Sequence, residues 1–286
     1  MAQPATTGNL ENAQRTIIAA ARFTEEHNAP AMNLIEKFTL GKGEKTVTVP
    51  KVGQMSMSDL TDGVDIIDEE DIGMTTVDLT ASEVGAKIIL TDKLVRQSAA
   101  NIMTIIGNQL GDGMARKKDV DVVSLYSGFS TDFGAAGRSM SLANVSAGVA
   151  YAKGKKFGSN VYINHHPFAV WDVANTAVTA SSTYPVPNGW SQDLLGNFFS
   201  GLRPINGVPI FEDGNISIDS SDDAVGVIAD RSALAVLMSM DTRREQQRDA
   251  SLRATEVIIT ADYGVFELDD SKGVAFTLDA GTPASA

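Results

Sequence analysis

Three consecutive segments near the C-terminus decide the expected fold: LAVLMSM at residues 234–240, DTRREQQRDASLRA at 241–254 and TEVIITADYGVFELDDSKGVAFTL at 255–278. The first is typical of a buried strand, predicted over residues 233–238, and the last contains two further β-rich apolar runs. The middle segment interleaves basic and acidic residues. It indicates either a solvated helix or loop with its own ion pairs, or a receptor surface for an acidic partner. None of these residues forms a group suited to catalysis.

The composition limits the class of protein. The chain has 286 residues, of which 43% are hydrophobic, enough for one large domain or two smaller ones. It contains no Cys, so disulfides and thiolate metal sites are excluded. The N-terminus lacks a signal-peptide pattern, and no segment reaches the roughly 20 apolar residues of a membrane span. We therefore expect a soluble protein made in the cytosol.

The formal net charge of -13 bears on the possible partners. Such a chain repels polyanions at long range, which argues against a protein that reads nucleic-acid sequence. Solubility is the favoured explanation of this charge, and the alternative is the wall of a DNA container, which should not grip its contents.

Residues 1–40 are expected to form an arm that is weakly tied to the rest of the subunit. Asn9 can cap a helix running to about Glu26, and a second short amphipathic piece covers residues 32–38, whereas no strand is expected before Gly41. The apolar side of the arm includes Leu10, Ile17 and Phe23. Packing on the same subunit and a strap over a neighbouring subunit are both compatible with this pattern.

Residues 41–90 are expected to form a long hairpin. Residues 46–49, 75–80 and 86–90 are predicted strands. Between the first two lies a polar excursion that is acidic and lacks Lys and Arg; its acidic residues are Asp59, Asp62, Asp65, Asp68, Glu69, Glu70 and Asp71. Loops of this length are usually functional or disordered, so we expect the hairpin to need a partner surface, and that surface to be basic.

A long helix and an alternating α/β region are predicted next. Thr91 can cap a helix running to about Tyr126, in which three glycines mark a place for a bend or break: Gly107, Gly111 and Gly113. After a connector, the pattern predicts further helices and strands. The helices cover 141–152, 167–177 and 191–199, and the strands cover 160–163, 207–211 and 224–228.

Several apparent chemical motifs do not support a site. His165 and His166 lack a third ligand at a defined spacing, so helix capping or solvent exposure is favoured over a metal. Residues 41–46 lack the order of a phosphate loop. Residues 213–224 lack the Gly and Glu of a calcium loop, which leaves only a weak exposed calcium site as an alternative. An aromatic group in this region is either local core or an interface anchor; it comprises Tyr184, Trp190, Phe198 and Phe199.

The order of these pieces resembles the major capsid proteins of tailed phages, with the fold of the Hong Kong lambdoid phage capsid. Local similarities are VYINHHPFAVWDVAN at 161–175, GVPIFEDGNIS at 207–217 and the ending at 224–268. The resemblance implies an α+β fold with an N-terminal arm, an extended hairpin loop, a peripheral domain with a long spine helix and an axial α/β domain. The implied boundaries are 1–40 for the arm, 41–90 for the extended loop, 91–135 and 240–280 for the peripheral domain, 136–239 for the axial domain and 281–286 for a tail.

The resemblance also implies a structural role without enzymatic activity, cofactor or metal. Copies would form pentamers and hexamers of an icosahedral shell around double-stranded DNA, contacted non-specifically. A separate scaffolding protein, a portal and a decoration protein are the further implied partners. The protein would reside in the virion after assembly in the bacterial cytoplasm, without membrane contact. The alternatives are an encapsulin-like compartment enclosing protein cargo and a non-assembling binding module.

The contacts between subunits are predicted from charge. Asp68, Glu69, Glu70 and Asp71 are expected to dock on basic residues of a neighbouring copy. The candidate receptors are Arg243, Arg244 and Arg248, followed by Arg116, Lys117 and Lys118. Some members of the resembled family join subunits through Lys–Asn bonds, but residues 56–73 contain no Lys, which argues against such a crosslink here.

Overall fold

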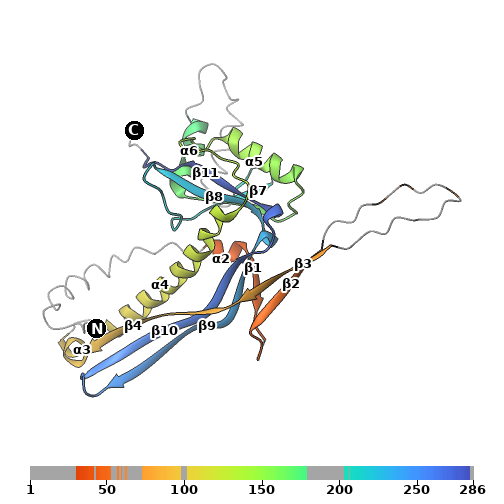
Figure 1. Cartoon of the computed structure of the whole chain (residues 1–286). Coiled ribbons are helices and arrows are strands. Elements are labelled where there is room, and N and C mark those ends of the chain that lie inside the picture. Colours follow the sequence, from red (N-terminus) through yellow and green to blue (C-terminus); the bar gives the residue numbers. More distant parts are fainter. Residues whose placement is uncertain are drawn as a thin grey trace.

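The computed structural model describes residues 30–41, 43–52, 57, 59, 62, 73–97, 102–178, 203–205 and 207–283. Two sheets, each with helices packed beside it, and one projecting two-stranded hairpin make up the described part (Figure 1). The expected α+β class is confirmed. No helix within the described ranges is long and apolar enough to cross a membrane.

The first sheet has the strand order β1 (Glu36–Thr39), β9 (Leu234–Asp249), β10 (Ala254–Glu267) and β4 (Ser82–Thr91). β1 runs parallel to β9, and the other neighbours are antiparallel. Along β10 every second side chain from Val257 to Tyr263 is buried, as expected for a strand with one covered face. That face packs against α4 (Ile102–Ser124), which lies along the sheet in Figure 1.

The charged segment after residue 240 corrects one expectation. It is neither helix nor loop, because β9 continues through it to Asp249 and stays paired with β10. The pairing satisfies the backbone, while the side chains from Asp241 to Arg248 are exposed, so charge is tolerated on both faces of this end of the sheet. Sequence patterning could not reveal a strand whose two faces are both polar.

The N-terminal segment corrects a second expectation. The amphipathic piece is a single helical turn, α2 (Ala31–Leu34), followed directly by β1. A strand therefore does precede Gly41, and it pairs with residues 235–238 of β9. The open edge of β9 supplies hydrogen bonds that local helical propensity could not anticipate.

The predicted long helix is described as α3 (Asp92–Gln97), α4 and the 3-10 turn η2 (Tyr126–Gly128), with residues 98–101 outside the described ranges. α4 continues without interruption through the three glycines at 107, 111 and 113, so the expected break is absent there. Gly107 instead makes room for a neighbour, because a Cβ at this position would lie 2.8 Å from Nη1 of Arg244.

The second sheet has the order β11 (Gly273–Asp279), β8 (Asp223–Asp230), β5 (Val161–His165), β7 (Val208–Glu212) and β6 (Arg203–Ile205). It packs with α5 (Leu142–Gly154) and α6 (Pro167–Val178), and β5 is buried along its whole length. These elements confirm the helices and strands predicted for residues 141–177, 207–211 and 224–228. The predicted helix 191–199 and the four aromatic residues 184, 190, 198 and 199 lie outside the described residues.

The last strand joins the second sheet rather than the first. β11 pairs with β8 throughout, so residues 273–279 lie beside residues 223–229 and away from β9 and β10. The chain thus crosses from one sheet to the other after β10, through the short 3-10 turn η4 (Asp270–Lys272). The domain boundaries drawn from the sequence stay a prediction.

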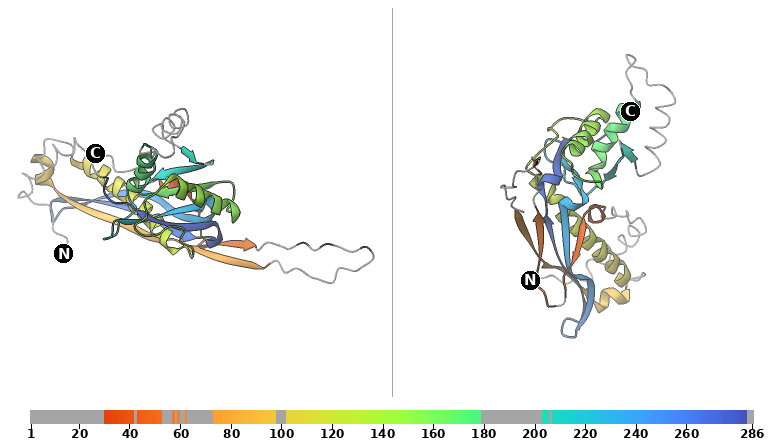
Figure 2. Two further views of the ribbon diagram at one scale, coloured as in Figure 1. Left: turned by 90° about the horizontal axis from the view of Figure 1, so that it is seen from above. Right: turned by 90° about the vertical axis from the view of Figure 1, so that its right-hand side faces the viewer.

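The hairpin consists of β2 (Thr46–Val52) and β3 (Met74–Thr80), paired in antiparallel register from Thr46↔Thr80 to Val52↔Met74. It projects beyond both sheets (Figure 2). Its base is anchored where β3 passes β10, since a Cβ on Gly264 would lie 2.3 Å from the backbone oxygen of Thr80. Its far end exposes an apolar pair, because Val52 and Met74 are 55% and 62% exposed.

Candidate intersubunit contact surface

The exposed end of β9 carries the arginines expected to receive an acidic partner. Arg248 donates from Nη1 and Nη2 to the two carboxylate oxygens of Asp92, at 2.9 and 2.8 Å. This hydrogen-bonded pair lowers the pKa of Asp92, raises the pKa of Arg248 and ties β9 to the start of α3. Arg243 pairs through Nε with Oε1 of Glu245 at 3.1 Å. An acidic partner would therefore compete with partners that Arg243 and Arg248 already have.

The basic residues of α4 differ from one another in exposure. Lys118 is buried, donates from Nζ to Oγ1 of Thr242 at 2.9 Å and lies 5.6 Å from the ring centre of Tyr263. Burial lowers the pKa of Lys118. Lys117 is exposed and pairs with Asp121, four residues along the helix, at 2.5 Å. Arg116 is exposed as well. Lys118 thus holds α4 against the first sheet, and Arg116 and Lys117 lie on the surface.

The other residues expected at subunit contacts lie outside the described residues. They are Leu10, Ile17, Phe23, Asp68, Glu69, Glu70 and Asp71. Their contacts stay a prediction from the sequence.

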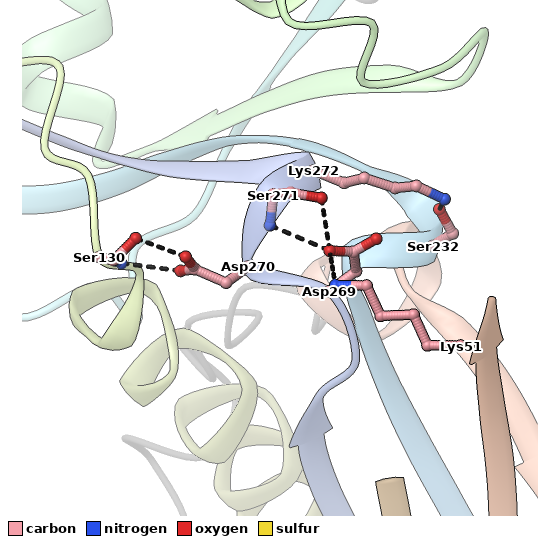
Figure 3. A network of polar contacts seen from close by, with 7 residues as sticks. All are labelled: Lys51, Ser130, Ser232, Asp269, Asp270, Ser271 and Lys272. Atoms are coloured by element: carbon pink, nitrogen blue, oxygen red, sulfur yellow. Dashed lines mark hydrogen bonds and ion pairs between the residues drawn. The ribbon is translucent and has the colours of Figure 1, made fainter. Parts of the chain in front are cut away.

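A polar junction network joins the end of β2 to the crossing between the sheets (Figure 3). Lys51 of β2 contacts Oδ1 of Asp269 at 2.5 Å, and Asp269 caps η4 by accepting from the backbone N and Oγ of Ser271 at 3.0 and 2.6 Å. Burial by itself would raise the pKa of Asp269, but the hydrogen bonds from Lys51 and Ser271 outweigh burial and lower it. The hairpin is therefore tied by charge to the turn through which the chain changes sheets.

Two further contacts of the junction network fix the same turn. Asp270 accepts from the backbone N of Ser130 at 2.8 Å and from its hydroxyl, so η4 is bound to the segment after η2. Lys272 donates from Nζ to Oγ of Ser232 at 3.2 Å, and Ser232 in turn donates to Asp230 at 2.6 Å. Figure 3 shows the contacts of Asp270 and Lys272 on the two flanks of η4.

A hollow of about 660 Å³ opens beside the junction network. Its lining includes the end of β2, the two lysines that follow α5, the turn η4, and Ser232. Four of the lining residues are lysines, and we call the space the lysine hollow: Lys51, Lys155, Lys156 and Lys272. Asp269 and Glu36 are the acidic residues of the same lining. The local charge is therefore positive on a chain with a net charge of -13.

A buried pair of carboxyl groups joins α2, α4 and the turn after β7. Asp119 and Asp213 have no exposed surface, and their side chains lie within hydrogen-bonding reach of each other. Asp119 accepts from the backbone N of Ala31 at 3.0 Å and from Nδ2 of Asn215 at 2.9 Å. Burial first, and then Asp213, raise the pKa of Asp119 to about 7.

The buried pair is best satisfied with one shared proton. Oδ2 of Asp213 is fully buried, and the described residues offer it no hydrogen bond as long as both carboxyl groups are ionised. A proton between the two carboxyl groups supplies one and removes the repulsion between two buried anions. Through the hydrogen bond from Ala31, Asp119 holds α2 against α4, the long spine helix expected from the sequence.

The two histidines are both buried, and His166 alone fits one of the two expected roles. Both are buried, so the expectation of solvent exposure is wrong, whereas helix capping is confirmed because Nδ1 of His166 accepts from the backbone N of Phe168 at 3.2 Å. Nε2 of His165 lies 2.9 Å from the carbonyl oxygen of Phe276, and burial lowers the pKa of His165 to about 4. Among the described residues no group of three or more His, Cys, Asp or Glu could hold a metal ion.

Comparison with known proteins bears on this arrangement of sheets, spine helix and hairpin. No family model and no curated protein sequence matches the chain. Solved structures do: the acid-stable capsid of Helicobacter pylori bacteriophage KHP30 is 12% identical, with a TM-score of 0.70 over 88% of this chain and 89% of that one. The chain has the tailed-phage capsid fold. The capsid of a native GTA particle is also 12% identical, with a TM-score of 0.68 over 90% of this chain and 92% of that one.

The tailed-phage capsid fold also covers a structure from Mycobacterium phage Che8. It is 15% identical, with a TM-score of 0.65 over 86% of this chain and 90% of that one. The resemblance inferred from the order of elements is confirmed at the level of the fold. At such low identity no individual side chain carries over, so contacts between subunits must be argued from this chain itself.

Sequence reasoning missed the lysine hollow and the buried carboxyl pair. The lysines of the hollow lie at residues 51, 155–156 and 272, and only the folded chain brings them together. Asp119 and Asp213 are 94 positions apart (213 − 119). The one local signal was Asp119 itself, an acidic residue on the face of a helix that is otherwise buried at Met114 and Val122.

Proposed function

We propose that this chain is a major capsid protein that self-assembles into the icosahedral head of a tailed phage and encloses double-stranded DNA. The observation that carries the proposal is the tailed-phage capsid fold over 86–90% of the chain in the structures compared above. Neighbours described as capsids support a structural role, without enzymatic chemistry.

The projecting hairpin supports repeated contacts between copies. An isolated two-stranded hairpin is marginally stable in water, and this one leaves most side chains of β2 and β3 exposed. The apolar pair Val52 and Met74 at its far end would be covered by a neighbouring copy. A surface that is used repeatedly between identical copies either closes into a shell or continues as a filament. Pentamers and hexamers are the closed arrangement that we infer.

The two sheets suggest how the subunit is divided in the shell. The sheet of β5 to β8 would form most of the axial domain, 136–239, and the sheet of β9 and β10 most of the peripheral domain, 91–135 and 240–280. The extended loop would be 41–90, and 281–286 a tail. Because β11 lies in the second sheet, we infer that the peripheral domain ends before Gly273. The pairing of β11 with β8 supports this earlier end of the peripheral domain.

The arm, residues 1–40, is proposed to strap neighbouring subunits together through Leu10, Ile17 and Phe23. Its end is fixed, because Asp119 binds the backbone N of Ala31 and β1 joins the first sheet. A segment that starts from a fixed point at the edge of a sheet can lie across an adjoining subunit at a modest entropic cost.

The remaining partners follow from the proposed role. A separate scaffolding protein, a portal and a decoration protein would contact the shell, and the packaged DNA would be contacted non-specifically. The net charge of -13 favours a wall that does not hold DNA tightly. Assembly would take place in the bacterial cytoplasm, and the mature protein would reside in the virion.

A shortened hairpin tests the proposed function. Replacing residues 53–73 by an Asn-Gly turn keeps the Val52↔Met74 end of the ladder and should leave a folded subunit. Sedimentation velocity of full-length protein, with and without a candidate scaffold, should show large closed particles, and the shortened variant should stay small. If both proteins form particles equally well, residues 53–73 of the hairpin are not needed for assembly. Particles that enclose protein and exclude DNA during packaging would favour the encapsulin-like alternative.

A further inference from the structure

We propose that the lysine hollow receives the acidic segment 59–71 of a second copy of this chain. The inference rests on the proposed function, since it names a contact between copies. The hollow is preferred to the arginines of β9 as the receptor. Arg243 and Arg248 already have carboxylate partners within the subunit, and the guanidinium of Arg244 lies against Gly107 of α4.

The lysines of the hollow differ from those arginines in their partners. Lys51 is paired with Asp269, whereas Lys272 donates to a neutral hydroxyl, that of Ser232. Lys155 lies 5.8 Å from the ring centre of Tyr151, and the described residues give its ammonium group no carboxylate partner. Lys156 is exposed, and the described residues provide its side chain with no ion pair. Three of the four ammonium groups thus lack a carboxylate partner within the described part of the chain.

The backbone places Lys156 in an unfavourable conformation. Its φ of 58° lies in the left-handed region, where the end of α5 is closed by a hydrogen bond from the backbone N of Phe157 to the oxygen of Ala152 at 3.1 Å. Glycine fits this position best. A Lys156→Gly change therefore removes one charge from the hollow without loss of the helix end, which provides a mild variant for testing.

The occupant is identified by charge complementarity. Residues 55–73 hold seven carboxylates and no Lys or Arg. β2 and β3 stay paired to Val52↔Met74, and the end of β2 lines the hollow beside Lys155 and Lys272. Carboxylates that enter a lysine-lined hollow form charge-assisted hydrogen bonds.

A binding experiment on unassembled, full-length subunits tests the proposal. The probe is a fluorescent peptide of residues 57–73, and its control is the same peptide with all seven acids replaced by Asn or Gln. The hosts are the natural chain, a variant with Lys155→Gln and Lys156→Gly, and a matched control with Lys93→Gln, an exposed lysine of α3. A fourth host has its own acids neutralised by Asp68→Asn, Glu69→Gln, Glu70→Gln and Asp71→Asn.

The expected result is salt-sensitive binding of the acidic peptide to the natural chain and to the Lys93→Gln host. Removing two lysines should weaken this binding about tenfold, as expected for two exposed or half-buried ion pairs. Equal affinity for the double variant and the Lys93→Gln host, absence of binding to all hosts, or equal binding of the neutral peptide would overturn the proposal.

The fourth host decides whether the occupant belongs to the same subunit. If the peptide binds only after the host's own acids have been neutralised, and this holds at high dilution, the segment fills its own hollow and the second-copy proposal is wrong. Peptide binding is measured without shells. If the peptide does not bind but the chain still forms shells, only the lysine hollow proposal is wrong. If the peptide binds but the chain forms no shells, only the proposed function is wrong.

Discussion

Changing Asp213 to Asn should alter how the stability of the subunit depends on pH. In the folded chain the pKa of Asp119 is about 7, against an ordinary value of 3.8. The difference of about 3 units corresponds to about 4 kcal/mol at ~1.36 kcal/mol per unit. Because the pKa of Asp119 is raised in the folded chain, its contribution to the free energy of unfolding is fully present below about pH 4. That contribution is lost as the pH rises toward 7.

The Asp213→Asn change would place an amide donor beside the carboxylate of Asp119, in the position that a shared proton otherwise fills. Burial would still raise the pKa of Asp119, so the substitution should remove the contribution of the neighbouring acid and not that of burial. We expect a gain of about 1–2 kcal/mol at pH 7–8 relative to the natural chain, from the stronger hydrogen bond and the lost repulsion, and little gain near pH 4.

Urea unfolding of unassembled subunits at pH 4 to 8 measures this difference directly. Glu83→Gln, at an exposed position of β4, is the matched control and should leave the pH dependence unchanged. If the Asp213→Asn curve runs parallel to the natural one at every pH, the two carboxyl groups do not share a proton and the reasoning fails.

Three further predictions concern single residues. Lys156→Gly should raise the unfolding free energy by about 0.5–1 kcal/mol, because glycine tolerates a φ of 58°; a loss of stability in urea would contradict this. Gly226→Ala should cost about 3 kcal/mol or more, since its Cβ would lie 2.2 Å from Cδ2 of His165 and 2.6 Å from the oxygen of Asn164; an unchanged melting temperature would refute the packing. His165, with a pKa lowered to about 4, should keep a neutral ring at pH 5 in NMR spectra and should destabilise the fold as the pH falls from 6.5 toward 4; titration near 6.5 would contradict its burial.

The fold could be predicted from the sequence because the order of its elements is distinctive. The spine helix, the hairpin strands and β5 with its following helix each have a clear local pattern, such as the Pro at the start of α6. The local sequence pattern of a segment predicted its structure less well at the edges of the sheets. β1 forms because the edge of β9 is open, and the second half of β9 is held by pairing with β10 although both its faces are polar.

The contact surface could be predicted only in part. Charge counting along the sequence identified an acidic segment and a basic segment, but it could not see that Arg248 is held by Asp92, 156 residues earlier in the chain. Nor could it place Lys118 beside Tyr263 in the interior. Such pairs depend on which side chains meet after folding, and the lysine hollow is assembled from separate segments in the same way.

Electron microscopy of the purified full-length protein, alone and with its candidate scaffold, tests the central claim most directly. We expect closed, icosahedral particles in which each projecting hairpin lies on an adjoining copy. Subunits that stay monomeric at high concentration under both conditions, or that form only open filaments, would contradict it.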